Sequence, residues 1–417
     1  MTAEPRRVLV VQDGARLHYA VPLALQQEGL LDRVATDWAS APRSVEEAIG
    51  RLVSAISPAA GARLLGRWRN GLRPGSIVRN PLMAIRHHAL RRRFRTDEEF
   101  FEYCSGEIAD WVIRRGFGRA NTLFGFVRNI HPRLLCAAHR RGLTTITDQI
   151  IAPAATEQSQ FEKELACWPG WHPGGAAGRD LRRVDAFERA TWSKTDALTC
   201  GSNYVKRELI AHGISPDRVS VIPYPVPLAA VRPHTQNNGK IMTVGFVGAV
   251  GLRKGAGYFA AVARRLAGPQ IRFVMVGPIH LTPPGERTLR DSGVTLVGQV
   301  PRSEVSEWLS RIDIFLFPST CEGSATAIME AMAAGLSVIC SPESGSVITD
   351  GVDGFIRDYD DEVGMAEAIR RLDEAPEIRA AISSAARTTA SRLNQAYYAE
   401  DLCKLIRNRE KTKSSKQ

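Results

Sequence analysis

The chain has 417 residues, of which 44% are hydrophobic and 24% charged, a composition typical of a folded protein with about two domains. Its formal charge of +11 favours anionic partners such as nucleotides, phosphorylated acceptors, acidic lipids or nucleic acid. No stretch approaches the roughly 20 apolar residues that cross a bilayer, and the charged start through Arg7 lacks the features of a secretory signal. The seven cysteines are scattered without a C-x-x-C pair, so we expect a reducing cytoplasm and neither disulfides nor a zinc site.

The first half of the sequence alternates short apolar runs with helical patterns. The run Val8–Val11 leads through a turn at Gly14 into a periodic segment, Leu17–Glu28, which stops at Gly29. Further apolar runs follow at 122–126, 145–147, 197–200 and 219–222. This alternation predicts an α/β domain with a parallel, doubly wound sheet over residues 1–230.

A strongly basic segment interrupts this pattern. Residues 63–95 contain ten arginines, His87 and His88 but no acidic residue, and apolar side chains such as Trp68 and Phe94 lie between them. We therefore treat residues 60–100 as an arginine-rich insertion. Cationic groups beside apolar side chains suit an acidic membrane surface or a phosphate-bearing acceptor, and a solvated helical face is the alternative.

The second half begins after a change of composition. Prolines and a polar run indicate an extended linker between residues 222 and 240. Residues 240–392 are predicted to form a second Rossmann-like domain, residues 393–408 a helix, and residues 409–417 a disordered tail. The predicted strands of the second domain lie at 242–247, 273–276, 295–297, 314–317 and 338–340.

The first strand of the second domain runs into a glycine-rich loop. This loop, Gly248 to Gly255, carries Arg253 and Lys254 directly before a helix. Free N–H groups at a helix start, with cations beside them, bind phosphates. Lys254 is therefore the candidate partner of a diphosphate, and a solvated Arg-Lys pair in a surface loop is the alternative.

The most informative segment is residues 317–335, with the sequence F-P-S-T-C-E-G-S-A-T-A-I-M-E-A-M-A-A-G. A strand leads through a tight turn into a helix with two carboxylates, Glu322 and Glu330, about 12 Å apart at ~1.5 Å rise per residue. That distance is the span of a sugar, a diphosphate and a ribose. Free N–H groups of Gly323 to Ala327 lie between the carboxylates, where the helix dipole favours an anion. Glu330 would accept hydrogen bonds from ribose hydroxyls, and Glu322 from sugar hydroxyls.

This segment resembles the E-x7-E signature and the E-A-M-A-x-G run of the retaining glycosyltransferases of family 4, which have the GT-B fold. The resemblance is strongest over residues 240–375, and in the first half only residues 199–206 and 219–225 look familiar. It implies two Rossmann-like domains with parallel sheets that face a central cleft. It also implies acceptor binding in the first domain, donor binding in the second, and a last helix that crosses back to the first.

The resemblance transfers donor-binding roles to particular residues. Lys254 inherits a contact with the donor phosphates. Many relatives carry an arginine where this chain has Ala249, so Arg253 is the candidate substitute. The residues expected to bind the donor are Gly248, Arg253, Lys254, Gly277, Val300, Glu322, Gly323, Ser324, Ala325, Thr326 and Glu330.

The catalytic residues depart from the family pattern. Relatives often have a histidine after a first-domain strand, but here the matching strand, 145–147, is followed by Asp148. His131 follows another strand at the edge where α/β proteins bind ligands, and a structural role at a helix start is its alternative. Glu322, His131 and Asp148 are the candidate catalytic residues.

The resemblance implies retaining transfer of a sugar, such as a hexose, from a UDP- or GDP-sugar to a glycan, lipid-linked or other acceptor. No metal or other cofactor is expected, because a helix start and basic side chains neutralise the leaving diphosphate. The expected setting is polysaccharide or glycolipid assembly in the cytoplasm, with peripheral contact of residues 63–95 to the inner face of the membrane. Alternatives are a nucleotide-sugar epimerase, a non-catalytic nucleotide-sugar-binding protein, and a protein that binds nucleic acid or membrane through its arginines, although no nucleic-acid-binding motif accompanies them.

Overall fold

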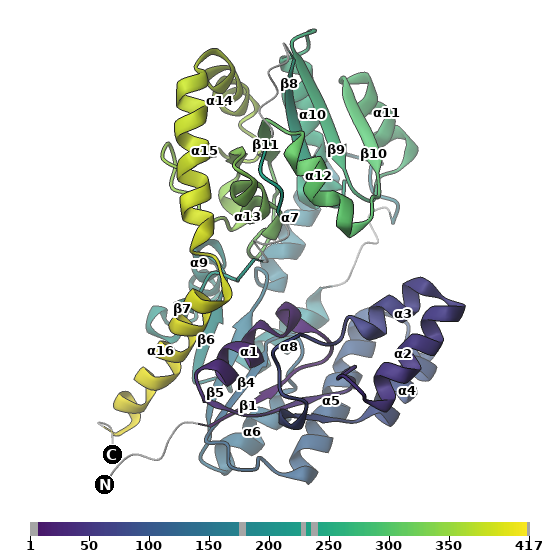
Figure 1. Cartoon of the computed structure of the whole chain (residues 1–417), viewed down its shortest axis with the longest axis vertical. Coiled ribbons are helices and arrows are strands. Elements are labelled where there is room, and N and C mark those ends of the chain that lie inside the picture. The colour runs from purple at the N-terminus through teal and green to yellow at the C-terminus, as the bar shows by residue number, and fades with distance from the viewer. Residues whose placement is uncertain (1–6, 175–180, 227–230, 235–240, 415–417) are drawn as a thin grey trace.

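The computed structural model shows two α/β lobes, each built on one parallel sheet (Figure 1). It describes residues 7–174, 181–226, 231–234 and 241–414. The predicted linker therefore lies partly outside the described residues. The predicted fold class, two Rossmann-like units with parallel sheets, is confirmed.

The first lobe contains a seven-stranded sheet in the order β3-β2-β1-β4-β5-β6-β7. The central strands are almost entirely buried, as expected for a parallel sheet covered by helices on both faces. Its strands are β1 (Val8–Val11), β2 (Leu31–Thr36), β3 (Ile77–Arg79), β4 (Thr122–Phe126), β5 (Thr144–Gln149), β6 (Ala197–Cys200) and β7 (Val219–Val221). Its helices are α1 (Ala20–Gln27), α2 (Val45–Ile56), α3 (Pro58–Leu65), α4 (Pro81–Leu90), α5 (Asp97–Arg115), α6 (Pro132–Arg140), α7 (Ala154–Cys167), α8 (Arg182–Trp192) and α9 (Asn203–Ala211).

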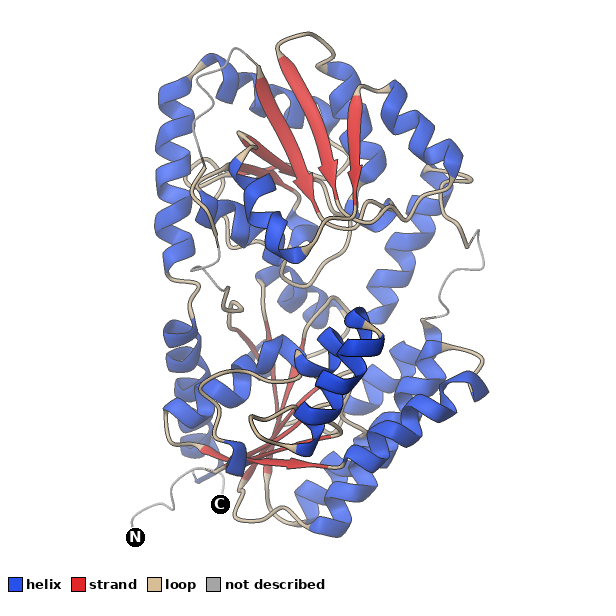
Figure 2. Cartoon of the chain, turned by 45° about the vertical axis from the view of Figure 1, so that its right-hand side comes forward, coloured by secondary structure: helices blue, strands red, loops and turns tan. Residues whose placement is uncertain are grey.

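The second lobe contains a six-stranded sheet in the order β10-β9-β8-β11-β12-β13. Figure 2 shows the arrowheads of its strands pointing toward the first lobe, so the loops after these strands face the space between the lobes. Its strands are β8 (Met242–Val247), β9 (Ile271–Val276), β10 (Val294–Gly298), β11 (Ile314–Phe317), β12 (Ser337–Cys340) and β13 (Phe355–Ile356). Its helices are α10 (Ala256–Arg265), α11 (Pro283–Asp291), α12 (Val305–Ser310), α13 (Thr326–Ala334), α14 (Glu362–Glu374) and α15 (Pro376–Ser391).

Helix α16 (Gln395–Ser414) returns from the second lobe to the first and lies against α1 (Figure 1). Its apolar residues Leu402 and Ile406 are buried in the same core as strand β1. At its start, Gln395 Nε2 donates a hydrogen bond to the carbonyl of Ala20 at 2.9 Å. The helix continues six residues beyond its predicted end at 408. Residues 415–417 of the predicted disordered tail lie outside the described residues.

Helix α7 belongs to the first lobe in sequence, but the residues after it pack into the second. Trp171 is part of the hydrophobic core of the second lobe, and Trp168 packs against that core. Thr282 Oγ1 donates a hydrogen bond to the carbonyl of Gly170 at 2.6 Å. Gly257 of α10 leaves room for the Trp168 ring, which a Cβ at that position would overlap. The segment from α7 to Trp171 is therefore a second physical connection between the lobes, in addition to α16.

Helices α2 and α3 form a hairpin beside α4, next to the β3 edge of the first sheet (Figure 1). The hairpin packs closely because Gly61 of α3 lies against the backbone of Ser54, where any Cβ would overlap it. Arg79 Nε, at the end of β3, donates to Glu46 Oε1 of α2 at 2.6 Å and attaches the hairpin to the sheet. Within the part of the chain that the structure describes, no helix is long and apolar enough to span a bilayer.

Candidate active site

A cavity of about 320 Å³ lies among the loops after β8, β9 and β10 and the start of α13. Of the residues predicted to bind the donor, all but Arg253 and Gly323 line it. Its shape depends on two glycines, because a Cβ on Gly277 would overlap the carbonyl of Gly248 and both residues have a positive φ. The loops after β8 and β9 can therefore approach each other closely only without side chains at these two positions.

Glu322 lies at one end of this cavity between two cations. Its Oε1 is 2.5 Å from Arg253 Nη1 and 2.5 Å from Lys254 Nζ. Lys254 also lies 4.9 Å from the centre of the Phe317 ring. Burial lowers the pKa of Lys254, and the neighbouring Glu322 carboxylate opposes that shift. Two cations against one carboxylate leave a net positive charge at the position where a diphosphate would lie.

Glu330 lies at the other end of the cavity, on the second turn of α13. The residue is 6% exposed and forms an ion pair with Arg302, whose Nη1 is 3.3 Å from Glu330 Oε2. The Arg302 side chain is 72% exposed, so it reaches this carboxylate from solvent. Sequence analysis missed Arg302, although its position two residues after the predicted donor residue Val300 was a usable signal.

The start of α13 presents hydrogen-bond donors to the cavity. In the described chain, the hydroxyl of Ser324 is buried without a hydrogen-bond partner. The first N–H groups of a helix have no partner within the helix, and here those of α13 begin at Thr326, which lines the same cavity. An unpaired hydroxyl next to a helix start, with Lys254 across the cavity, is a suitable environment for a phosphate.

A second cavity of about 310 Å³ lies between the lobes and adjoins the first, because Ala249 and Lys254 line both. Its second-lobe wall includes Arg253, which thus lies on the other side of Lys254 from the first cavity. Its first-lobe wall is formed by residues that sequence analysis did not identify: Glu157, Phe161, His172 and Leu181. His172 Nδ1 accepts a hydrogen bond from the N–H of Gly174 at 3.1 Å, so the neutral ring carries its proton on Nε2.

A buried ionic network positions Glu157 in this wall. Arg128, two residues after the end of β4, donates to Glu157 Oε2 at 3.0 Å and to Glu188 Oε1 at 2.7 Å. Glu188 Oε2 also accepts from the N–H of Ala154 at the start of α7, at 2.7 Å. The network therefore fixes α7 to α8 and holds a carboxylate beside the interlobe cavity.

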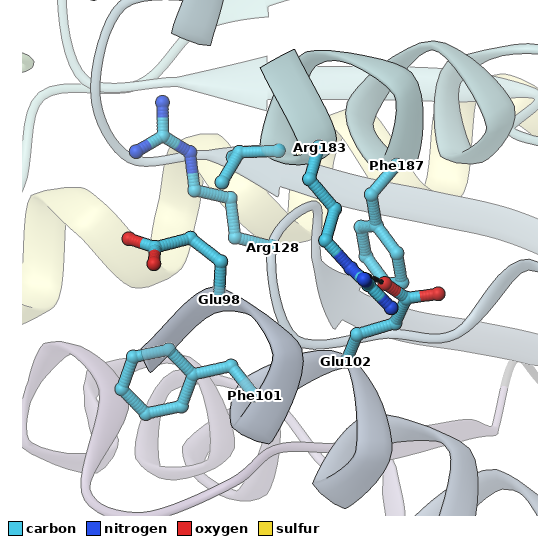
Figure 3. A pocket seen from close by; sticks show the side chains of 7 residues that line it. Glu98, Phe101, Glu102, Arg128, Arg183 and Phe187 are labelled. Atoms are coloured by element: carbon cyan, nitrogen blue, oxygen red, sulfur yellow. Dashed lines mark hydrogen bonds and ion pairs between the residues drawn. The ribbon is translucent and has the colours of Figure 1, made fainter. Parts of the chain in front are cut away.

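A smaller cavity of about 60 Å³ lies between α5 and α8, with Arg128 of this network in its wall (Figure 3). Figure 3 shows Arg183 and Glu102 joined across it, with Arg183 Nε 2.7 Å from Glu102 Oε2. Phe101, also in its wall, is 44% exposed. Arg128 lines this cavity too, so the pocket and the interlobe cavity are neighbours on the first lobe.

Asp148 and His131 lie away from both main cavities. Asp148 is buried, with its oxygens accepting from Thr199 Oγ1 and Tyr224 OH, each at 2.7 Å. Burial raises the pKa of Asp148 to about 6, against these two hydrogen bonds. His131 is the N-cap residue of α6, where its Nδ1 accepts from the N–H of Arg133 at 3.2 Å, and it lines an open pocket on the first lobe. The structure therefore brings Glu322 together with Lys254, but brings neither Asp148 nor His131 to them.

Among the described residues, no group of three or more histidine, cysteine, aspartate or glutamate side chains is arranged to hold a metal ion.

Comparison with protein families matches two segments of the chain. The family described as Glycosyl transferases group 1 matches residues 242–374, and the one described as Glycosyltransferase Family 4 matches residues 165–230. Two segments of the chain thus match glycosyltransferase families, one of them family 4. The family resemblance predicted from the E-x7-E segment is thereby confirmed.

Curated relatives of this glycosyltransferase family match parts of the chain. The gpi3 subunit of phosphatidylinositol N-acetylglucosaminyltransferase from Schizosaccharomyces pombe is 29% identical over 174 residues, 40% of this chain and 37% of that protein. The amylovoran biosynthesis glycosyltransferase AmsK of Erwinia amylovora is 38% identical over 89 residues, 19% of this chain and 22% of AmsK. The chain thus spans well under half the length of these relatives.

Solved structures match nearly the whole chain in fold. Sucrose-phosphate synthase from Thermosynechococcus elongatus has a TM-score of 0.65 at 16% identity, covering 98% of this chain and 100% of that one. HepE of Anabaena, in complex with UDP and glucose, has a TM-score of 0.59 at 11% identity, covering 97% of this chain and 100% of HepE. At these identities the matches establish the shared fold.

Proposed function

We propose that this protein transfers a sugar from a nucleotide-diphosphate donor to an acceptor, with retention at the anomeric carbon. The observation that carries the proposal is the arrangement around the first cavity. Lys254 and the unpaired Ser324 hydroxyl face the start of α13, with one carboxylate at each end of the cavity. The matches to two glycosyltransferase families and the UDP and glucose bound in the HepE structure, which shares the fold, support the same donor class.

The donor would lie along the start of α13. Its phosphates would contact the N–H groups of α13, Ser324 and Lys254, its ribose would contact Glu330, and its sugar would face Glu322. Both carboxylates are ion-paired within the chain, so donor binding would replace the contacts of Glu322 with Lys254 and of Glu330 with Arg302. The positive charge freed at Lys254 then neutralises the leaving diphosphate, which supports metal-independent transfer.

The acceptor would bind on the first-lobe side of the interlobe cavity. Glu157 would accept hydrogen bonds from hydroxyl groups, His172 would donate one from Nε2, and Phe161 would offer an apolar face. We propose a glycan or lipid-linked acceptor of polysaccharide or glycolipid assembly at the cytoplasmic side of a membrane. AmsK is named for amylovoran biosynthesis and the gpi3 relative for phosphatidylinositol N-acetylglucosaminyl transfer, and both names support this class of acceptor.

Calorimetric titration tests the donor site first. The wild type should bind one of UDP, GDP or ADP selectively, and the corresponding sugar conjugate more tightly. Transfer with that donor should proceed with a chelator present, and NMR of the product should show the donor's anomeric configuration. Absence of binding to any of these nucleotides would contradict the proposal, and inversion at the anomeric carbon would overturn its stereochemistry.

A further inference from the structure

Helix α2 presents a stripe of large apolar side chains to solvent. Val45 is 72% exposed, Leu52 68% and Ile56 88%. Their spacing of seven and four residues places all three on one face of the helix, where the smaller exposed residue Ala48 also lies. Grouped apolar side chains on a surface mark an interaction site more often than single exposed ones.

The fold of the protein does not use this stripe. The opposite side of α2 packs on α3 through Gly50, where a Cβ would lie 2.8 Å from Leu65 Cδ2, and through the close approach of Gly61 to Ser54. Glu46 attaches the same helix to β3 through Arg79. The contacts that hold α2 in place are therefore complete without Leu52 and Ile56.

The region around the stripe carries nearly all of the chain's net charge. From Arg43 to Arg95 there are twelve arginines and two glutamates, a formal charge of +10 out of +11 for the chain. Both glutamates are already ion-paired, Glu46 with Arg79 and Glu47 with Arg51. The remainder of the chain is close to neutral, but three of its carboxylates, Asp37, Glu107 and Asp97, pair with Arg67, Arg86 and Arg91 of this segment. The exposed arginines of the segment include Arg63, Arg92, Arg93 and Arg95.

Helix α4, in the same segment, also presents apolar side chains to solvent. Leu82 is 77% exposed and Ile85 54%. The other side of α4 is buried against α5, where the His87 ring lies 5.9 Å from that of Tyr103 and 6.3 Å from that of Phe100. Anchoring through His87 explains how α4 is held while Leu82 and Ile85 stay exposed.

We propose that α2 and the arginines around it dock this protein on an anionic lipid surface. Leu52 and Ile56 would enter the boundary between headgroups and acyl chains, and exposed arginines of this segment, such as Arg63 and Arg92, would contact the lipid phosphates. A nucleic acid would be recognised by the cations alone, with no use for an aliphatic stripe at this spacing. The combination of charge and apolar residues therefore favours a membrane over a nucleic acid as the partner. This proposal does not depend on sugar transfer.

The position of this surface is consistent with an acceptor held at a membrane. The Arg91 guanidinium, directly after α4, lies 5.1 Å above the ring of Phe100. That ring lies 6.0 Å from Phe101, which lines the small pocket of Figure 3. The rings of Phe100 and Phe101 thus connect Arg91 of the basic segment to the first-lobe pocket.

Vesicle flotation with the full chain tests the proposal. Phosphatidylcholine vesicles with and without phosphatidylglycerol would be compared for the wild type and for the double variant Leu52→Ser/Ile56→Ser. The wild type should float with the anionic vesicles only, and the variant should lose recovery by about tenfold or more. The matched control is Val352→Ser/Val363→Ser, which removes two exposed apolar residues of the second lobe, 57% and 47% exposed, and should float like the wild type.

A second variant tests the electrostatic contribution. Arg63→Glu/Arg92→Glu should weaken flotation and reduce its dependence on salt. Unchanged thermal unfolding in all variants would show that the fold is intact. Equal recovery of wild type and stripe variant, equal recovery with neutral vesicles, or self-association that the stripe variant abolishes would each overturn the proposal. RNA binding by the wild type that the stripe variant retains, without flotation, would assign the arginines to nucleic acid.

Discussion

At the scale of single residues, the candidate donor cavity contains two carboxylates that are ion-paired within the chain, Glu322 with Arg253 and Lys254 and Glu330 with Arg302. Removing the carboxylate at Glu330 should weaken nucleotide binding. Glu330→Ala is expected to cost roughly one to three kcal/mol in the affinity for the preferred nucleoside diphosphate, since the hydrogen bonds to a charged acceptor are lost. Calorimetric titration measures this directly, and unchanged affinity would contradict the ribose contact.

Arg302→Ala is the informative companion to that variant. It leaves Glu330 in place and removes the guanidinium that pairs with it. If ribose hydroxyls displace Arg302, the variant should bind at least as tightly as the wild type. A loss as large as that of Glu330→Ala would instead show that Arg302 itself contacts the nucleotide.

Lys254 should act on the phosphates alone. Lys254→Ala is expected to weaken nucleoside diphosphate binding by roughly 1.5–3 kcal/mol, the range for a hydrogen bond to a charged group. Binding of the free nucleoside should change little. Titrations with both ligands check this, and equal losses for the two would contradict a phosphate contact.

The residues that sequence analysis found and those it missed differ in how they reach the site. Glu322 and Glu330 belong to one strand–loop–helix unit, so their separation follows from the geometry of a single helix. Lys254 likewise belongs to one strand–loop–helix unit, in the loop just before α10. Glu157 and His172 reach the interlobe cavity only because α7 and the residues after it cross between the lobes. No local sequence pattern encodes this tertiary arrangement.

At the scale of elements, α7 carries a titratable contact to the second lobe. Tyr258 OH of α10 donates to Glu164 Oε1 at 2.9 Å, and burial, assisted by Asp360, raises the pKa of Glu164 from near 4.5 to about 7. Between these values the folded protein holds a proton that the unfolded chain releases. The contribution of Glu164 to stability is therefore full below about pH 4.5 and is lost as the pH rises toward about 7.

Glu164→Gln should remove this pH dependence because glutamine does not ionise. The free energy of unfolding of the variant is expected to fall less than that of the wild type between about pH 5 and pH 8. Urea unfolding of both proteins at several pH values measures the difference between their free energies of unfolding. The titration of all groups that the two proteins share cancels in this difference. Parallel curves for the two proteins would show that Glu164 is ionised in the folded state.

The α2–α3 hairpin depends on close backbone packing. Gly61→Ala places a methyl group on the backbone of Ser54, so we expect a destabilisation of roughly 1–3 kcal/mol, the cost of overpacking. The control is Gly75→Ala, since a Cβ at Gly75 meets no atom within 4 Å. Urea unfolding of both variants checks the prediction. Equal stability of the two variants would show that α2 and α3 can move apart to accommodate the methyl group at little cost.

Elements with strong local patterns were predicted well, and short or exposed ones were missed. The predicted bounds of β1, β4, β8 and β11 match the structure, because each is a buried apolar run. Strand β2 is only half buried, and β3 has three residues, so neither shows the apolar run of a central strand. Their position is set by pairing with β1 and with each other.

At the scale of the whole molecule, the lobes touch through the loop of the E-x7-E segment. Gly323 lies against the carbonyl of Ile150 in the first lobe, and its own carbonyl accepts from Ser202 Oγ at 2.5 Å. Gly323→Ala should separate the lobes, since the added methyl group would overlap Ile150. The variant should retain nucleotide binding, lose sugar transfer and show a larger radius of gyration in solution scattering.

The control for this variant is Gly268→Ala, a site with no crowded neighbour in the second lobe. Unchanged scattering together with unchanged transfer for Gly323→Ala would show that the lobes do not need this contact. Loss of nucleotide binding as well would place the effect in the donor cavity.

The two-lobe architecture followed from the alternation of apolar runs, which repeats on both sides of the proline-rich segment. The connections between the lobes did not follow from it. Tertiary packing of Trp168 and Trp171 determines the path of α7, and these tryptophans show no periodic pattern in the sequence. The arginine-rich segment was evident from composition, but the apolar stripe of α2 needed the structure to show which face was free.

The return of α16 to the first lobe has a consequence for how the protein is made. Strand β1 leaves the ribosome first, yet its core includes Tyr398, Leu402 and Ile406 of α16, which are synthesised after the whole second lobe. Domains generally fold as units as they emerge during translation. Here the second lobe has all of its strands before the first lobe has its last helix, so the lobe that is synthesised first completes its core last. Until then the apolar residues of the first lobe that pack against α16 have no cover from this helix.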